Sequence, residues 1–217
     1  LAIGRAAEAF ITAERELGED GFCVETGAYG AAILGGTRGV IYGVYELLER
    51  MGCRFFTPSC EKVPSMPELT LPEVHTCQVP VLEYRDHGYC DFVQNGRFAV
   101  KCRLNGHFPQ IKDKFGGHMP YTGYVHTLGT IVPVEEWGES HPEYFALYNG
   151  KRCTLKNRTQ LCLTNPDVVR VATEKVRQML RENPGTRLFS ISQNDVGTGC
   201  TCEKCLAADR EEGSPAG

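Results

Sequence analysis

The residues between positions 189 and 195 carry side chains suited to chemistry. The segment Phe189-Ser190-Ile191-Ser192-Gln193-Asn194-Asp195 is typical of a short buried strand that ends in an amide and a carboxylate. Helical spacing precedes it over 166–180, with Asn165 as the expected N-cap and Asn183-Pro184-Gly185 as the stop. A helix followed by a strand with polar residues at its exit is typical of a (β/α) barrel, where chemistry takes place at the carboxyl ends of the strands.

A second group of reactive side chains follows directly. Three thiols fall within Cys200-Thr201-Cys202-Glu203-Lys204-Cys205, and Cys162 stands just before the helix that leads into the same strand. Four thiolates form the tetrahedral site of structural zinc, which leaves no open position for catalysis. We therefore expect a zinc ion that clamps the loop behind Asp195. A redox or disulfide pair and free thiols are the alternatives that this spacing leaves open.

The cysteines as a whole do not indicate a disulfide framework. Eleven cysteines are many for 217 residues, but an odd number cannot pair completely. Several lie in apolar or strand-like contexts, where a thiol acts as a small hydrophobe: Cys23, Cys53, Cys77, Cys102 and Cys162. A chain of this length buries a sizeable core without disulfides, so we expect most of these thiols to be free.

The composition excludes some classes of function. Hydrophobic residues make up 41% of the chain, the formal net charge is −4, and no apolar run is long enough to cross a bilayer. We therefore expect neither nucleic-acid binding nor a membrane-spanning segment. The chain begins at Leu1 without a methionine, so we expect a fragment of a longer protein, whose signal peptide would lie outside it.

Residues 1–75 are predicted to form a small α/β module. Helical periodicity covers 2–15, strands are expected over 21–26 and 31–35, and an amphipathic helix over 39–51. The glycine-rich turn at 35–39 has neither the Lys-Ser/Thr of a nucleotide loop nor the dinucleotide glycine spacing. We interpret it as a tight strand-to-helix turn.

A second domain is predicted over residues 80–217. An extended connection near residues 72–80 is indicated by Pro58, Pro64, Pro67, Pro72 and Pro80. Beyond it, 81–86 is a strand candidate, 92–104 a helix candidate and 106–124 a long loop rich in glycine and aromatic residues. Because about 250 residues make a whole barrel, the second domain is expected to be incomplete.

Longer motifs resemble carbohydrate-active families. Residues 39–49 (GVIYGVYELLE) and 52–56 (GCRFF) resemble the N-terminal module that precedes the barrel in bacterial α-glucuronidases and β-N-acetylhexosaminidases. The motifs HTL, HPEYFAL, QLCLTNP and QND, which begin at positions 126, 141, 160 and 193, together resemble the bacterial domain-of-unknown-function 4838 family. This resemblance implies a glycoside-hydrolase-like protein: an α/β module followed by the first part of a (β/α)₈ TIM barrel.

The same region also resembles a specific hexosaminidase segment. There, a comparable strand ends in an Asp-Glu pair whose glutamate is the general acid. By that register Asn194 takes the aspartate position and Asp195 the position of the acid. This sequence has no carboxylate at the first of these positions. It thereby departs from the substrate-assisted mechanism, in which that carboxylate orients an acetamido group.

Asp195 is the candidate catalytic residue, and Asn194 is a candidate substrate-binding residue. Glycosidic cleavage needs a proton donor at the leaving oxygen and a second carboxylate as base, nucleophile or stabiliser of the oxocarbenium-like state. We expect the second carboxylate outside this sequence, and hence an inactive fragment. Binding of substrate hydroxyls and capping of the turn before Gly197 are the alternative roles of Asp195.

Arg85, Asp86 and His126 are further candidate substrate-binding residues. Arginine binds carboxylates through two parallel hydrogen bonds, so Arg85 at a strand end suits sugar hydroxyls or a uronate. A buried Arg-Asp pair that seals the barrel mouth is the alternative. His126 lies in the long loop, and binding residues concentrate in loops.

The sequence therefore predicts an extracytoplasmic glycoside hydrolase that cleaves O-glycosyl bonds of oligo- or polysaccharides without a catalytic cofactor. A non-catalytic carbohydrate-binding protein on the same barrel is the alternative, which Asn194 favours. A zinc-dependent hydrolase is a third possibility, and it would need an open coordination position on the metal.

Overall fold

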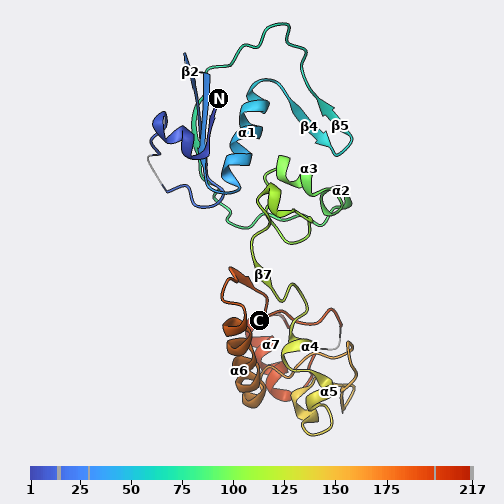
Figure 1. Ribbon diagram of the computed structural model, residues 1–217. Coiled ribbons are helices and arrows are strands. Elements are labelled where there is room, and N and C mark those ends of the chain that lie inside the picture. The colour runs from blue at the N-terminus through green and yellow to red at the C-terminus, as the bar shows by residue number, and fades with distance from the viewer. Residues whose placement is uncertain (14–15, 29, 198, 216–217) are drawn as a thin grey trace. The chain divides into compact units, whose positions relative to one another are not determined.

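The chain is a mixed α/β protein with two compact units, residues 1–119 and 120–217 (Figure 1). The computed structural model describes residues 1–13, 16–28, 30–197 and 199–215. These residues form one four-stranded and three two-stranded sheets, and they contain no closed barrel.

The first unit is built on the four-stranded sheet, whose strand order is β1-β3-β2-β6. β1 is parallel to β3, whereas β2 is antiparallel to both β3 and β6. The strand bounds are β1 Ala2–Ile3, β2 Phe22–Gly27, β3 Gly30–Gly35 and β6 His75–Gln78. The predicted strands at 21–26 and 31–35 are thus confirmed.

Helix α1 (Gly39–Arg50) covers one face of this sheet, and its Tyr42 packs in one core with Phe22 and Ile33. The helix lies so close to the sheet that a Cβ at Gly43 would approach Ile33 Cγ2 to 2.5 Å. The predicted helix at 39–51 is therefore confirmed, and a glycine is required where it contacts the sheet.

The other face is covered by the 3₁₀ helix η1 (Gly4–Ala9), where Ala7 and Ile11 pack against Cys23 and Ala32. The α-helix expected over 2–15 does not form in residues 2–13, which are a short strand, the 3₁₀ helix and non-helical backbone, and residues 14 and 15 lie outside the described residues. Gly4 has a φ of 63°, in the left-handed region, so a continuous α-helix cannot pass through it.

Cys23 and Cys77 form a disulfide bond, which corrects the expectation that both are free thiols. They lie directly opposite each other on the antiparallel strands β2 and β6. Their separation of 54 residues gives no sign of this pairing, because the register of the strands decides it. The other nine cysteines are free.

Residues 81–119 pack against the first module, so the compact units divide after Met119 and not within 72–80. Ala99, Val100 and Ile111 share one core with Phe22 and Tyr42. The short elements of the segment 51–119 are β4 Arg54–Thr57, β5 Cys60–Lys62, α2 Cys90–Val93, α3 Gly96–Lys101 and η2 Asp113–Phe115.

Two predicted elements of this segment differ from the structure. The strand expected at 81–86 does not form, because the backbone of Arg85 pairs with Asn105: its N–H donates to Asn105 Oδ1 at 2.8 Å. The expected helix 92–104 is divided into α2 and α3, since Asn95 has the non-helical angles φ −131° and ψ 74°.

The second unit contains a parallel pair of strands, β7 (Tyr121–Thr122) and β10 (Leu188–Phe189). β10 is shorter than predicted, because it includes only Phe189 of the segment 189–195 that is expected to be a strand. The long helix α6 (Pro166–Glu182) begins as predicted, because Asn165 Oδ1 accepts the N–H of Asp167 at 3.0 Å. The other elements are α4 Leu128–Ile131, α5 Val134–Trp137, η3 Pro142–Tyr144, β8 Leu147–Tyr148, β9 Lys151–Arg152 and α7 Glu203–Glu212.

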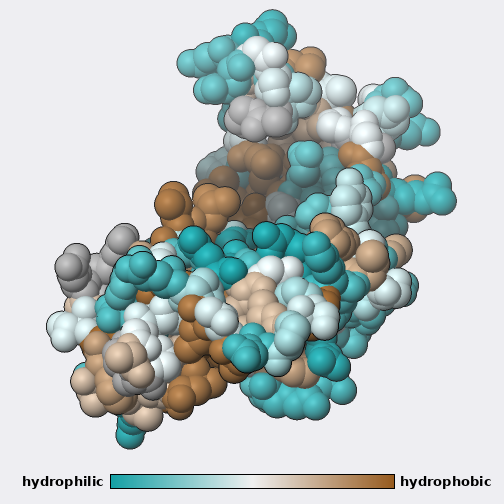
Figure 2. Space-filling model, turned by 90° about the horizontal axis from the view of Figure 1, so that it is seen from above, coloured by the Kyte–Doolittle hydropathy of each residue, from teal (hydrophilic) through white to brown (hydrophobic). Residues whose placement is uncertain are grey.

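The core of the second unit joins α6 to the short helices before it. Val168 and Val171 of α6 pack with Leu128, Ile131 and Phe145. The face drawn in Figure 2 carries broad hydrophilic areas together with smaller hydrophobic patches. Among the described residues, no helix combines the length and the apolar character that a membrane crossing requires.

Candidate functional site

The strands β7 and β10 run parallel, so the segments that follow them leave the sheet at the same edge. His126 follows β7, whereas Asn194 and Asp195 follow β10. All three residues line one cleft of about 830 Å³ in the second unit. The structure thus brings together three of the predicted site residues.

The cleft has an apolar base and a polar border. Val132, Phe145 and Leu161 are buried residues of the core that also line the cleft. Its polar and charged lining consists of His126, Thr130, Glu135, Glu136, Lys156, Asn157, Thr159, Asn194 and Asp195. Such a combination binds a polar organic ligand through hydrogen bonds over a small apolar surface.

Asn194 is fixed by its neighbours. Its Oδ1 accepts the N–H of Gly129 at 3.0 Å, and its Nδ2 donates to the carbonyl of Thr159 at 2.7 Å. Gln160 holds the same turn, because its Oε1 accepts the N–H of Asn194 at 3.0 Å and its Nε2 donates to the carbonyls of Asn194 and Val196. Both ends of the Asn194 amide therefore position the loop that carries Asp195.

Asp195 is exposed in the cleft. Within the described part of the chain, its carboxylate makes no hydrogen bond or ion pair, so it does not cap the turn. The carboxylate is thereby available to a ligand.

His126 has a constrained backbone and a constrained ring. Val125 and His126 have φ values of 54° and 59°, and non-glycine residues in this left-handed region often occur at binding sites. The His126 N–H donates to Ser192 Oγ at 2.9 Å, and its Nδ1 lies 3.0 Å from the Gln193 carbonyl oxygen. Because a carbonyl only accepts, Nδ1 carries the hydrogen, and Nε2 is the ring nitrogen left for a ligand.

Two cleft carboxylates are absent from the sequence-based prediction. Glu135 and Glu136 lie on α5 and line the same cleft as Asp195. Lys156 forms an ion pair with Glu135, and this hydrogen bond holds the pKa of Glu135 below its usual value. In the sequence the two residues are typical of the exposed first turn of a helix, so no local signal distinguishes them from a solvated surface.

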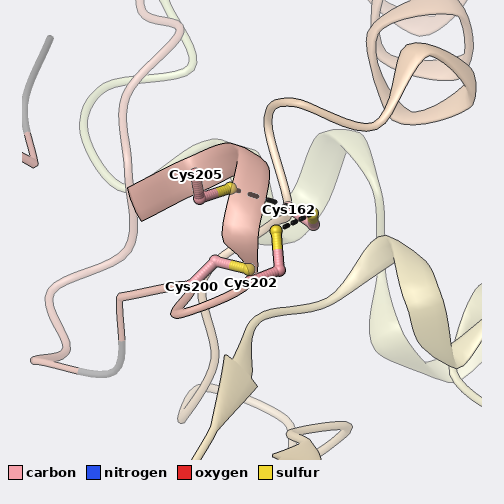
Figure 3. A group of neighbouring side chains, drawn as sticks. All are labelled: Cys162, Cys200, Cys202 and Cys205. Atoms are coloured by element: carbon pink, nitrogen blue, oxygen red, sulfur yellow. Dashed lines mark hydrogen bonds between the residues drawn. The ribbon is translucent and has the colours of Figure 1, made fainter. Parts of the chain in front are cut away.

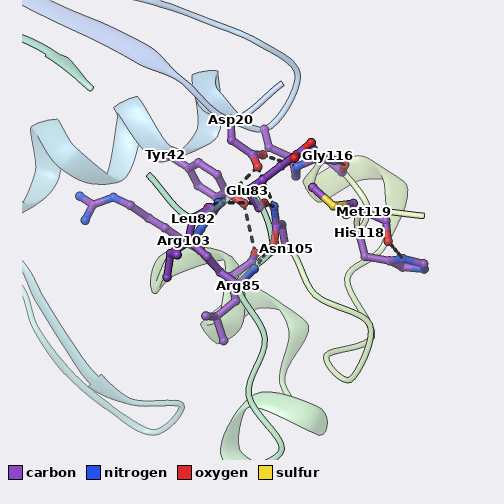
Figure 4. A network of polar contacts seen from close by, with 12 residues as sticks. Asp20, Tyr42, Leu82, Glu83, Arg85, Arg103, Asn105, Gly116, His118 and Met119 are labelled. Atoms are coloured by element: carbon purple, nitrogen blue, oxygen red, sulfur yellow. Dashed lines mark hydrogen bonds and ion pairs between the residues drawn. The ribbon is translucent and has the colours of Figure 1, made fainter. Parts of the chain in front are cut away.

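Arg85 belongs to the first unit, and its guanidinium bonds to the protein itself (Figure 4). Its Nη2 donates to Asp20 Oδ2 at 3.2 Å, its Nε to the Arg103 carbonyl at 2.8 Å and its Nη1 to the Leu82 carbonyl at 2.8 Å. Arg85 therefore forms an ion pair with an aspartate, but the acid is Asp20 and not Asp86.

Asp86 also forms hydrogen bonds within the first unit. Its carboxylate accepts the Tyr84 hydroxyl and the backbone N–H groups of His87, His107 and Phe108. Arg85 and Asp86 thus lie in the first unit, whereas the residues that line the cleft all belong to the second.

Asp20 is the centre of the network around Arg85. It is 8% exposed, forms an ion pair with Arg38 and accepts Asn105 Nδ2 at 2.6 Å. Tyr42 lies beside this network, and its hydroxyl donates to the Leu104 carbonyl at 3.1 Å. Burial, with the negative charge of Asp20, raises the pKa of Tyr42 to about 12.

The four predicted metal-binding cysteines form one cluster, and Figure 3 shows them together at the start of α7. Their sulfur atoms all lie within 4.8 Å of one another, with Cys162 at 3.7 Å from Cys202 and 3.9 Å from Cys205. Tetrahedral Zn–S bonds of about 2.3 Å imply sulfur separations of about 3.8 Å. The cluster therefore has the donor set of a metal site, and two of its sulfur separations match that spacing.

The four thiols differ in acidity. Burial raises the pKa of Cys162, and it raises that of Cys205 to about 12. The pKa of Cys202 is about 6, because hydrogen bonds from Cys205 and the neighbouring sulfurs outweigh desolvation. A divalent cation favours the ionised form of every thiol that it binds, so it would suit all four together.

Comparison with known proteins identifies a family. No curated protein and no solved structure matches the chain. A family model with the description "Domain of unknown function (DUF4838)" matches residues 55–217, which include the cleft and the cysteine cluster. The match covers most of the chain. The protein therefore belongs to the family Domain of unknown function (DUF4838).

Proposed function

We propose that the protein hydrolyses O-glycosyl bonds of complex glycans, with the cleft of the second unit as substrate site and Asp195 as proton donor. One observation carries this proposal. Asp195 lies exposed in a cleft of about 830 Å³, on a loop that Asn194 and Gln160 hold in place. A fixed loop with an unpaired acid is what proton transfer to a bound substrate requires.

In this mechanism Asp195, as the carboxylic acid, donates its proton to the glycosidic oxygen as the C–O bond to the anomeric carbon breaks. The positive charge that develops at that carbon needs an ionised carboxylate nearby, and a water molecule then forms the new bond to the carbon and returns one proton to Asp195. Glu135 and Glu136 line the same cleft, and Lys156 keeps Glu135 ionised. Either residue is a candidate for the second carboxylate, in addition to one outside this sequence.

His126 would then bind a substrate hydroxyl. Its Nδ1 is held by the Gln193 carbonyl, so Nε2 can accept a hydrogen bond from a sugar O–H. Asn194 supports this site through its bonds to Gly129 and Thr159. We assign Asn194 a positioning role in place of direct contact with the substrate.

We propose that the second unit folds as the first part of a (β/α)₈ barrel. The parallel pair β7 and β10, with α6 between them in the chain, supports it, as does the position of the cleft after both strands. An extracytoplasmic location is also proposed, and the Cys23–Cys77 disulfide supports it because disulfides persist in oxidising compartments.

The cysteine cluster is proposed to hold a structural zinc ion through Cys162, Cys200, Cys202 and Cys205. The four thiols fit this ion in type and in spacing. When bound, zinc would cross-link the starts of α6 and α7 and would supply no catalytic step. The loop of Asp195 would be fixed twice, by Gln160 and, a few residues later, by Cys200.

A carbohydrate-binding protein without catalysis is the second candidate, and Asn194 favours it. The residue before Asp195 is an amide, bonded to Gly129 and Thr159, so it offers no second acid at this position. Glycan arrays probed with the intact protein would show binding in both cases, whereas release of reducing ends would occur only for the enzyme.

The decisive experiment is Asp195→Asn in the intact protein. If Asp195 is the proton donor, turnover falls far more for a substrate with a poor leaving group than for an activated aryl glycoside, because only the former needs protonation. Glu139→Gln is the matched control, since Glu139 is an exposed carboxylate of the second unit outside the cleft. Equal losses on both substrates would remove Asp195 from proton transfer.

A further inference from the structure

We propose that Arg152 is a positioning residue of the cysteine cluster: its guanidinium offsets the negative charge of the bound centre at Cys200 and so strengthens metal binding. This inference rests on the proposed zinc site. It adds a residue outside the four cysteines. This residue lies on the hairpin of β8 and β9, which the spacing of the thiols in the sequence does not indicate.

The position of Arg152 is well defined. It ends the strand β9, half-buried, and its Nη1 donates to the Phe145 carbonyl at 2.8 Å. The same Nη1 lies 3.9 Å from Cys200 Sγ. The bond to Phe145 therefore holds the guanidinium beside the sulfur.

The charge of Arg152 acts on Glu143 and on Cys162 as well as on Cys200. Within the described part of the chain, its guanidinium makes no ion pair with a carboxylate. Four thiolates around one divalent cation carry a net charge of −2, and removing such a charge from water is unfavourable without nearby donors. Arg152 is therefore placed to offset about half of that charge.

A second donor from the same hairpin points to the same sulfur. The Leu147 N–H, on β8, donates to Cys200 Sγ at 3.3 Å. Thr201 is tied to the same residue, because its N–H and its hydroxyl both donate to the Leu147 carbonyl at 2.7 Å. The hairpin thus supplies N–H donors from both strands to Cys200. At metal sites, residues that hydrogen-bond to a ligand without binding the metal orient that ligand and favour its ionised form.

The test measures metal affinity and not turnover. Intact protein is titrated with Co²⁺, whose thiolate charge-transfer and d–d bands report tetrahedral sulfur coordination, and Zn²⁺ then displaces the cobalt. The variants are Arg152→Gln, which loses the charge, and Arg152→Lys, which keeps it. Arg170→Gln is the matched control, because Arg170 is an exposed arginine of α6 with ion pairs only to surface carboxylates.

We expect Arg152→Gln to weaken zinc binding about 10- to 100-fold, as loss of an outer partner does at other metal sites. Arg152→Lys should retain most of the affinity, and Arg170→Gln should bind as the unchanged protein does. In a Cys200→Ser background Arg152→Gln should have a smaller further effect, because part of the interaction runs through that sulfur and the rest through Cys162.

Failure of the zinc site and failure of the role of Arg152 give different results. If the unchanged protein binds neither metal with sulfur coordination, the proposed zinc site fails, and this inference with it. If the unchanged protein binds and Arg152→Gln binds equally well, only the role of Arg152 is overturned. If Arg152→Gln does not fold, Arg152→Lys becomes the test. A folded lysine variant that binds zinc only as well as the Cys200→Ser protein would contradict charge compensation. A lysine variant with near-normal zinc affinity would support it.

Discussion

Asp20 in the first unit and Asp195 in the second are both aspartates in polar surroundings, yet their environments are opposite. Asp20 is 8% exposed and contacts Arg38, Arg85 and Asn105. Asp195 is exposed in a cleft and has no partner among the described residues. The first carboxylate holds the fold together, whereas the second is free to bind a ligand.

This difference distinguishes a charge that the fold pairs from one that the fold leaves available to a ligand. Arg85 and Asp86 stand in a motif that suggests sugar binding, but their polar atoms bond to the protein itself. His126 and Asp195 come from loops that are fixed by other residues, namely Ser192, Asn194 and Gln160. A candidate binding residue is therefore best judged by which of its polar atoms the fold has already paired.

The largest effect is expected for Asp20→Asn. Removing one member of a buried ion pair leaves the partner charges uncompensated, and such changes destabilise by about 3–5 kcal/mol. Arg38 and Arg85 would both lose their carboxylate. Urea denaturation of the intact protein measures the change. Asp91→Asn is the control, because Asp91 is exposed on α2; equal stability of the two variants would contradict a structural role for Asp20.

Metal removal should affect the second unit alone. At free zinc about a hundredfold above its dissociation constant, binding adds about 2.7 kcal/mol of stability to the state that binds it. Chelation should therefore speed amide hydrogen exchange in α6 and α7, which the cysteine cluster joins. Exchange in α1 should not change, since α1 belongs to the first unit and its core. Unchanged exchange in α7 would contradict the zinc clamp.

Alkaline pH should weaken the first unit through Tyr42. Its pKa is raised to about 12 in the folded chain, from 10.0 in the absence of the fold. The contribution of Tyr42 is complete below pH 10 and is lost as the pH rises towards 12, because the unfolded state ionises first. The loss is on the order of 2 kcal/mol. The test measures the unfolding free energies of the unchanged protein and of Tyr42→Phe from pH 9 to 11.5. We expect the two curves to converge as the pH rises. Parallel curves would contradict this role of Tyr42.

The sequence predicts best those elements that local rules determine. The helix from Pro166 has its Asn165 cap, and α1 has its amphipathic face and its glycine-rich entry. The cysteine cluster is also predictable, because three of its members lie within six residues and the fourth precedes a helix joined to the same strand.

Features that depend on tertiary pairing were not predictable from the sequence. The register of β2 against β6 determines the Cys23–Cys77 disulfide, and the partners of Arg85 come from distant segments. Glu135 and Glu136 belong to the cleft only because the fold places α5 beside it. Periodicity and spacing describe neighbours along the chain, so they cannot distinguish such pairs from surface residues.

Asp195→Asn should have the smallest effect on stability, although it is the same chemical change as Asp20→Asn. The Asp195 carboxylate pairs with no described residue, and exposed substitutions of this kind stay within about 0.5 kcal/mol. Urea denaturation should therefore show the unchanged midpoint, while turnover of poor-leaving-group glycosides falls. A destabilisation comparable to that of Asp20→Asn would mean that Asp195 is paired in the intact protein, and the contrast between the two units would not hold.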